Sequence, residues 1–207
     1  MSGVTRSSQA TGAAAAARVA RARRSLPNGW WGMLLLLCAE ATLFGTLIAS
    51  YAYLRLQTPA WPPAGIDPPS LTAPLALTAV LVATTAPMLL ATRAARAGRG
   101  ASARRLIVAA TLVQAAYLAG QIVLFLDDLS AFDPRDTSYG SVYFTLLGAH
   151  HAHVLVGLLL NAGVLIRLLG GLTNYLLIGV RALALYWCFV NAVAILVVLT
   201  QLSPALL

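Results

Sequence analysis

The sequence is poor in charge and contains no lysine. Only 10% of its 207 residues are charged, against about 25% in an ordinary soluble domain, and 59% are hydrophobic. All 14 basic residues are arginine, and the net charge is +8. Because the arginines fall between long apolar runs rather than along one folded surface, the composition argues against nucleic-acid binding. The composition predicts a protein that is surrounded by lipid in a membrane.

Cysteine and histidine are also scarce. The two cysteines, Cys38 and Cys188, each lie inside an apolar run and belong to no CxxC pair, so we expect small buried hydrophobic residues. The three histidines, His150, His151 and His153, lie within four residues of one segment. A haem or copper site needs ligands from different helices. The sequence therefore predicts neither a metal site nor a redox centre in this chain.

Long apolar runs are abundant instead. Five segments have roughly the 17–25 residues that cross about 30 Å of hydrocarbon. Backbone groups in lipid must be hydrogen-bonded within a segment, which favours helices over strands. We predict an all-α integral membrane bundle of five transmembrane helices, with a kink at Pro87 near the inner end of the second. The expected bounds are approximately 30–54, 74–92, 106–126, 141–166 and 182–202.

The arginines also predict how the bundle is oriented. With the N-terminus inside and the C-terminus outside, two arginines, Arg55 and Arg135, lie outside and twelve lie inside. This split is a strong positive-inside signal, and five of the six acids fall in the outer loops. The inner arginines are Arg6, Arg18, Arg21, Arg23, Arg24, Arg93, Arg96, Arg99, Arg104, Arg105, Arg167 and Arg181.

The chain divides into a short tail and a membrane domain. Residues 1–28 are rich in Ala, Ser and Arg, and we expect a disordered cytoplasmic tail, with an organellar transit peptide as the alternative. Residues 29–207 form the five-helix domain. Trp30 is expected at the inner membrane interface, and Trp61 and Arg55 at the outer interface, at the depth of the lipid headgroups.

Glu40 is the acid that lies inside an apolar segment. It is ten residues past Trp30 and so roughly 15 Å into the membrane, where an ionisable group costs several kcal/mol and indicates a functional site. The alternative is a protonated Glu that makes one interhelical hydrogen bond for packing. We expect Glu40 to face the bundle interior, where burial favours the protonated carboxyl unless a histidine pairs with it.

Other helices place polar residues near the same depth as Glu40. These are Gln114 on the third helix, Asn191 on the fifth, and His150 and His153, which share a face of the fourth at i and i+3. They are the candidate partners of Glu40. On the first helix, small residues spaced by four predict a close-packing stripe, formed by Ala41, Gly45 and Ala49.

Several sequence motifs occur together between Gly29 and Leu202. The first helix reads WWGMLLLLCAEATLFGTLIASYAYLR and the loop after it WPPAGIDPP. The fourth helix begins YGSVYFTLLGAHHAHVLVG, and the fifth contains LYWCFVN. In these motifs and their order the chain resembles subunit III of the haem–copper oxidases, in the short five-helix bacterial form that lacks the first two helices of the longer version.

The resemblance implies a non-redox core subunit of a cytochrome c oxidase in the inner membrane of a bacterium. Its direct partner would be subunit I, which holds the haems and copper and reduces oxygen while pumping protons, with subunit II in the same complex. The chain would bind phospholipid between its helices and support proton uptake. Glu40 would be the family's carbodiimide-reactive carboxylate, and His150 and His153 its paired histidines.

Two other functions stay open, the first because of a departure from the family. Where the family usually reads Tyr-Trp-His-Phe-Val-Asp, Cys188 and Asn191 replace the His and the Asp. One alternative is therefore an accessory protein of a nitric oxide reductase, since the acceptor chemistry resides in another polypeptide. A small proton-coupled transporter that relays protons through Glu40 and the histidines is the other. Five helices without visible repeats argue against the inverted repeats of such carriers.

Overall fold

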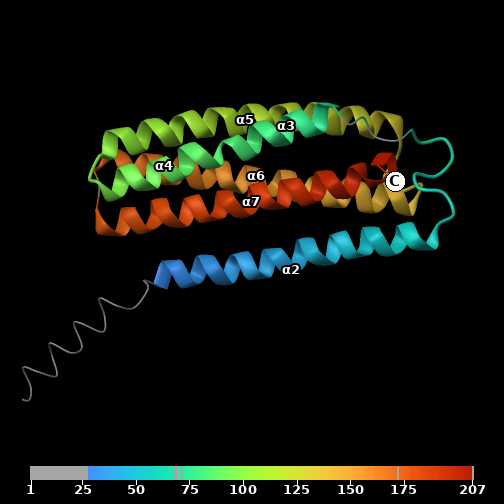
Figure 1. Ribbon diagram of the computed structural model, residues 1–207, viewed down its shortest axis with the longest axis horizontal. Helices are drawn as coiled ribbons and strands as arrows, with labels where there is room; N and C mark the ends of the chain where they lie inside the picture. Colours follow the sequence, from blue (N-terminus) through green and yellow to red (C-terminus); the bar gives the residue numbers. More distant parts are fainter. Residues whose placement is uncertain (1–27, 68–69, 71, 172, 207) are drawn as a thin grey trace, which may run out of the picture.

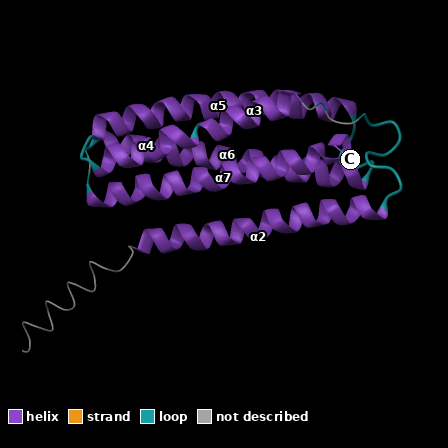
Figure 2. Ribbon diagram, viewed as in Figure 1, coloured by secondary structure: helices purple, strands orange, loops and turns teal. Residues whose placement is uncertain are grey.

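The structure is a computed structural model that describes residues 28–67, 70, 72–171 and 173–206. Within these ranges every regular element is an α-helix, and five spans are long and apolar enough to cross a membrane (Figure 2). The predicted all-α bundle of five spans is confirmed, whereas residues 1–27 of the predicted tail lie outside the described residues. The helices are α2 (Asn28–Gln57), α3 (Thr72–Ala83), α4 (Thr85–Arg96), α5 (Gly100–Ala131), α6 (Ser138–Leu169) and α7 (Asn174–Leu206).

The helices extend beyond the apolar runs because local capping continues them into the polar ends. At the start of α6, Thr137 accepts a hydrogen bond at its side-chain oxygen from the backbone N–H of Gly140, at 3.0 Å. A Cβ on Gly140 would lie 2.9 Å from the carbonyl oxygen of Asp133, so only glycine fits there. The hydroxyl of Ser141 donates to the carbonyl of Pro134 at 2.6 Å. These contacts account for the Tyr-Gly-Ser helix start.

The second predicted span is broken in its middle, at Thr84, rather than near its inner end, where a kink at Pro87 was predicted. Residues Thr72–Arg96 form one span, but α3 ends at Ala83 and α4 begins at Thr85. Pro87 has no N–H to donate, and its ring clashes with the carbonyl four residues earlier, which belongs to Ala83. The disturbance therefore appears on the N-terminal side of the proline.

Helix α2 lies along one side of the bundle, against α6 and α7 (Figure 1). Its buried side chains are Leu37, Phe44 and Tyr51, which recur at every seventh position and form a narrow seam. In an apolar 18-residue stretch of each span, only 11% of the residues are buried in α2, compared with 56% in α7. Helix α7 is thus central, whereas α2 is peripheral.

The stripe of small residues on α2 does not form this seam. Ala41, Gly45 and Ala49 are exposed, and a Cβ on Gly45 would meet nothing within 4 Å. The prediction that they pack α2 onto its neighbours in this chain is wrong. The bulky side chains of Leu37, Phe44 and Tyr51 fill the seam instead.

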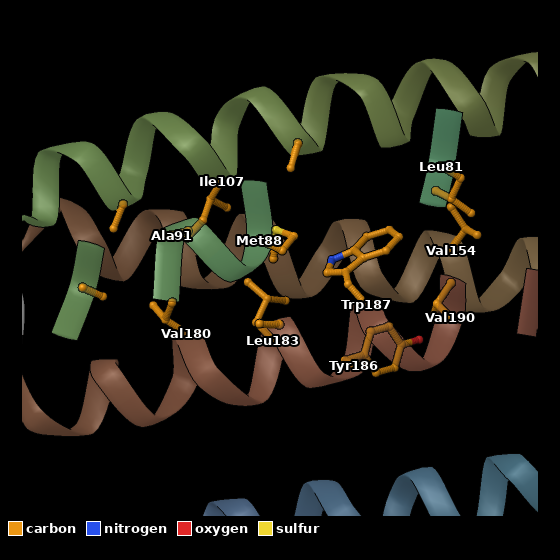
Figure 3. Close-up of a cluster of buried hydrophobic side chains, with 14 of the residues drawn as sticks. Leu81, Met88, Ala91, Ile107, Val154, Val180, Leu183, Tyr186, Trp187 and Val190 are labelled. Atoms are coloured by element: carbon orange, nitrogen blue, oxygen red, sulfur yellow. The ribbon is translucent and has the colours of Figure 1, made fainter. Parts of the chain in front are cut away.

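The core lies between α4, α5, α6 and α7. Figure 3 shows Trp187 of α7 among apolar side chains that include Met88 and Leu183. Trp187 is fully buried, and Gly157 of α6 makes room for its indole ring. A Cβ on Gly157 would lie 2.6 Å from Cζ2 of Trp187. The glycine therefore permits the close contact of α6 with α7.

Candidate functional site

Glu40 meets His153 where α2 packs against α6. Glu40 Oε2 lies 2.8 Å from His153 Nε2, and the two side chains are 24% and 17% exposed, respectively. The Phe44 ring packs edge-on against the His153 ring, with 5.0 Å between the ring centroids. The carboxyl group therefore has a histidine partner, but it lies in the α2 seam rather than in the centre of the bundle.

The hydrogen bonds of His153 determine how many protons the pair shares. His153 Nδ1 lies 2.7 Å from the carbonyl oxygen of Ala149, and a carbonyl oxygen only accepts, so we assign a hydrogen to Nδ1. The contact between Nε2 and Glu40 then holds one proton. Either the carboxylic acid donates to a neutral imidazole, or an imidazolium donates to the carboxylate. Both forms have no net charge, which lowers the cost of placing ionisable groups in hydrocarbon.

His150 and His153 do not form one site. His150 is buried, and its Nε2 lies 3.1 Å from the hydroxyl oxygen of Tyr117 on α5. His153 contacts Glu40 on α2 instead. Three residues turn a helix by about 300°, which leaves the two side chains about 60° apart. That angle is large enough for the two histidines to reach different neighbouring helices.

Gln114 belongs to a buried network that the sequence alone did not reveal. Asn161 Nδ2 donates to Gln114 Oε1 at 2.8 Å and to Thr111 Oγ1 at 2.9 Å, while Asn161 Oδ1 accepts from Trp187 Nε1 at 2.8 Å. Gln114 Nε2 donates to Thr84 Oγ1 at 3.1 Å. The network joins the break in the second span to α5, α6 and α7. The sequence did not indicate that Thr84 and Thr111 take part, because threonine hydroxyls in helices usually bond to the backbone of their own helix.

Asn191 is also directed away from Glu40. Its Nδ2 donates to Thr85 Oγ1 at 2.7 Å, and its Oδ1 is buried without a hydrogen-bond partner among the described residues. The polar residues that were predicted to lie at the depth of Glu40 therefore belong to separate sites in the bundle. Of those proposed as partners of Glu40, the structure brings only His153 into contact with it.

The residues expected at the membrane interfaces lie at the ends of α2. The Arg181 guanidinium carbon is 5.2 Å from the ring centroid of Trp30, a cation–π contact. At the other end Trp61 packs edge-on against Tyr51, with ring centroids 5.2 Å apart. Arg55 lies in the last turn of α2. These side chains anchor both ends of α2.

The fold and the site define a class, namely a multi-pass helical membrane protein with one Glu–His pair at a helix seam. In the described part of the chain, no three His, Cys, Asp or Glu side chains gather where they could hold a metal ion. The chain belongs to the cytochrome c oxidase subunit III family, whose model matches residues 20–202. It is 27% identical over 167 residues to a cytochrome c oxidase subunit 3 from Thermostichus vulcanus, a match that covers 80% of this chain and 82% of that one.

These comparisons confirm the family on which the sequence interpretation rested. They support a cytochrome oxidase subunit III that lies in a membrane and belongs to a complex with other oxidase subunits.

Proposed function

We propose that this chain is a non-redox subunit III of a cytochrome c oxidase, and that it packs directly on subunit I in a complex that also holds subunit II. In this proposal the haems and the copper belong to subunit I. Family membership supports the assembly. Co-purification with a larger subunit that contains both haem and copper is the expected result. The metal content of that partner also separates an oxidase from a nitric oxide reductase.

We also propose that the chain lies in a bacterial inner membrane with its N-terminus inside. Arg96 ends α4 and Arg99 lies in the connection to α5, and Arg167 and Arg181 flank the connection between α6 and α7 at the same end of the bundle. The opposite end carries acids in the connections. This asymmetry favours the arginine-rich end as the inner one.

The observation that carries the functional proposal is the 2.8 Å contact between Glu40 and His153. The pair shares one proton and remains partly exposed at the seam, so it can respond to charge in a neighbouring subunit. We propose that it supports proton uptake by the complex and stabilises the contact with its partner. A fully buried and fully hydrogen-bonded group would change its proton at much higher cost.

A pocket near the inner end of α2 supports phospholipid binding. It has a volume of about 200 Å³ and lies between α2, α4 and α7. Arg96 and Arg181 supply guanidinium groups suited to a phosphate, whereas Leu89 and Leu185 offer apolar surface to an acyl chain. The combination fits an anionic headgroup that is held at the membrane surface.

The test of the Glu40 role is Glu40→Gln in the intact complex. Glutamine keeps the size of the side chain and a hydrogen-bond donor for His153, but it does not titrate. We expect loss of dicyclohexylcarbodiimide labelling of this chain, fewer protons pumped per electron, and a shorter active lifetime during turnover. Thr46→Val is the matched control, because Thr46 lies exposed on the same helix and its hydroxyl bonds only to the carbonyl of Leu43.

The outcome that contradicts this role is a Glu40→Gln complex with unchanged labelling, pumping and lifetime. Loss of the subunit from the complex in Glu40→Gln would indicate that the carboxyl group stabilises the contact with the partner subunit.

A further inference from the structure

A further polar site lies inside the bundle, apart from the Glu40–His153 pair and the Asn161 network. A cavity of about 30 Å³ lies between α3, α5, α6 and α7. Asp128 and Tyr143 line it near the connection between α5 and α6, and Tyr117 and His150 line it deeper in the membrane. The remaining polar side chains on its wall are Thr78, Gln121 and Gln201.

Two polar atoms on this wall have no partner in the described part of the chain. They are Nδ1 of His150 and Nε2 of Gln201, and the side chains are only 1% and 6% exposed. A buried donor or acceptor that is left unpaired costs about 1–3 kcal/mol. Both residues line the same cavity, so small polar ligands in the cavity can bond to them.

Two hydrogen-bonded pairs mark the ends of the cavity. Tyr143 donates from its hydroxyl to Asp128 Oδ2 at 2.7 Å, and the Tyr117 hydroxyl lies 3.1 Å from His150 Nε2. Tyr143 and His150 are seven residues apart on α6, which separates the two pairs by about 10 Å along the helix. Gln121 lies between them on the α5 wall. The polar groups therefore form a row that runs from the ends of α5 and α6 into the membrane interior.

The size and the polarity of the cavity select its ligand. A water molecule needs roughly 10–15 Å³ of such volume and two to four polar partners, and cavities that stay dry are lined by apolar groups. A volume of about 30 Å³ is thus sufficient for about two waters and too small for a lipid chain.

We infer that this cavity is a water-filled crevice that connects the Asp128 end of the bundle to His150. One water accepts a hydrogen bond from Gln201 Nε2, and water also contacts His150 Nδ1. The His150 ring then exchanges protons with the aqueous phase at the Asp128 end, whereas His153 on the same helix pairs with Glu40. This inference concerns a site other than the Glu40–His153 pair and does not depend on the proposed function.

The test is hydroxyl-radical footprinting by brief X-ray exposure of the intact complex in lipid nanodiscs, which oxidises side chains beside bound water. Tyr117 and Tyr186 are a matched pair, since they are 2% and 1% exposed and of the same type. Tyr186 lies outside the cavity, and its hydroxyl donates to the carbonyl of His153. We expect Tyr117 to be oxidised several-fold faster than Tyr186. Equal rates would overturn the inference, and this comparison needs no variant.

A variant tests the role of the unpaired amide. Gln201→Met keeps the side-chain volume but removes the donor, so Tyr117 oxidation should fall to the rate of Tyr186. Thr200→Val is the control, because the Thr200 hydroxyl bonds to the carbonyl of Leu196 and does not line the cavity. Tyr117 oxidation in Gln201→Met that stays at the wild-type rate would also overturn the inference.

Discussion

Two of the hydrogen-bonded polar regions of the bundle, the Asn161 network and the Glu40–His153 pair, differ in how completely their side chains are enclosed. Asn161 is fully buried and bonds through both its oxygen and its nitrogen to side chains of α5 and α7. Glu40 has a single histidine partner and remains 24% exposed. Helix α6 contributes to both regions. The enclosed network specifies how four helices pack, whereas the seam pair makes one contact between α2 and α6.

The largest effect that follows from this comparison is expected for Asn161→Leu. The substitution removes the hydrogen-bond partner of Trp187 Nε1, Gln114 Oε1 and Thr111 Oγ1. We therefore expect a loss of about 2–4 kcal/mol in the free energy of unfolding. Unfolding by sodium dodecyl sulfate in mixed micelles measures it. Leu159→Ala on the exposed side of α6 is the control. A loss no larger than that of the control would show that the network is dispensable.

A smaller effect is expected for Gly157→Ala. The added Cβ would lie 2.6 Å from the Trp187 ring, and overpacking of this kind costs about 1–3 kcal/mol. Gly163→Ala on the same helix is the matched control, because a Cβ there meets nothing within 4 Å. In the same unfolding assay Gly163→Ala should be neutral or stabilising, because alanine favours the helix by about 1 kcal/mol over glycine. Similar results for both variants would contradict close packing at Trp187.

The smallest effect on stability is expected for Glu40→Leu. The variant loses one hydrogen bond at a partly exposed seam, and such bonds in membrane proteins contribute about 0.6 kcal/mol on average. We therefore expect a change in unfolding free energy of about 1 kcal/mol or less, in the assay used for Asn161→Leu. Thr42→Val, an exposed position on the same helix, controls for the loss of polarity. A loss as large as that of Asn161→Leu would remove the distinction between the two regions.

The number of spans followed from hydropathy because each span must be apolar over the thickness of the bilayer. The helix ends were less predictable: capping by Thr137 and the polar ends of α5 lie outside the apolar runs. The position of the break was also missed. Pro87 marked a disturbance, but its clash acts on the preceding turn and places the break at Thr84.

By itself, the sequence determined that lipid surrounds the protein, and it determined the five spans, the family and the position of the Glu40 carboxyl group in the middle of the first span. Only the tertiary structure decided which polar groups meet. His150 and His153 looked equivalent in the sequence, yet one contacts Tyr117 and the other Glu40. The physical reason is that depth in the membrane depends on position along one helix, whereas contact depends on how each helix is rotated against its neighbours. That rotation is set by packing such as Gly157 against Trp187.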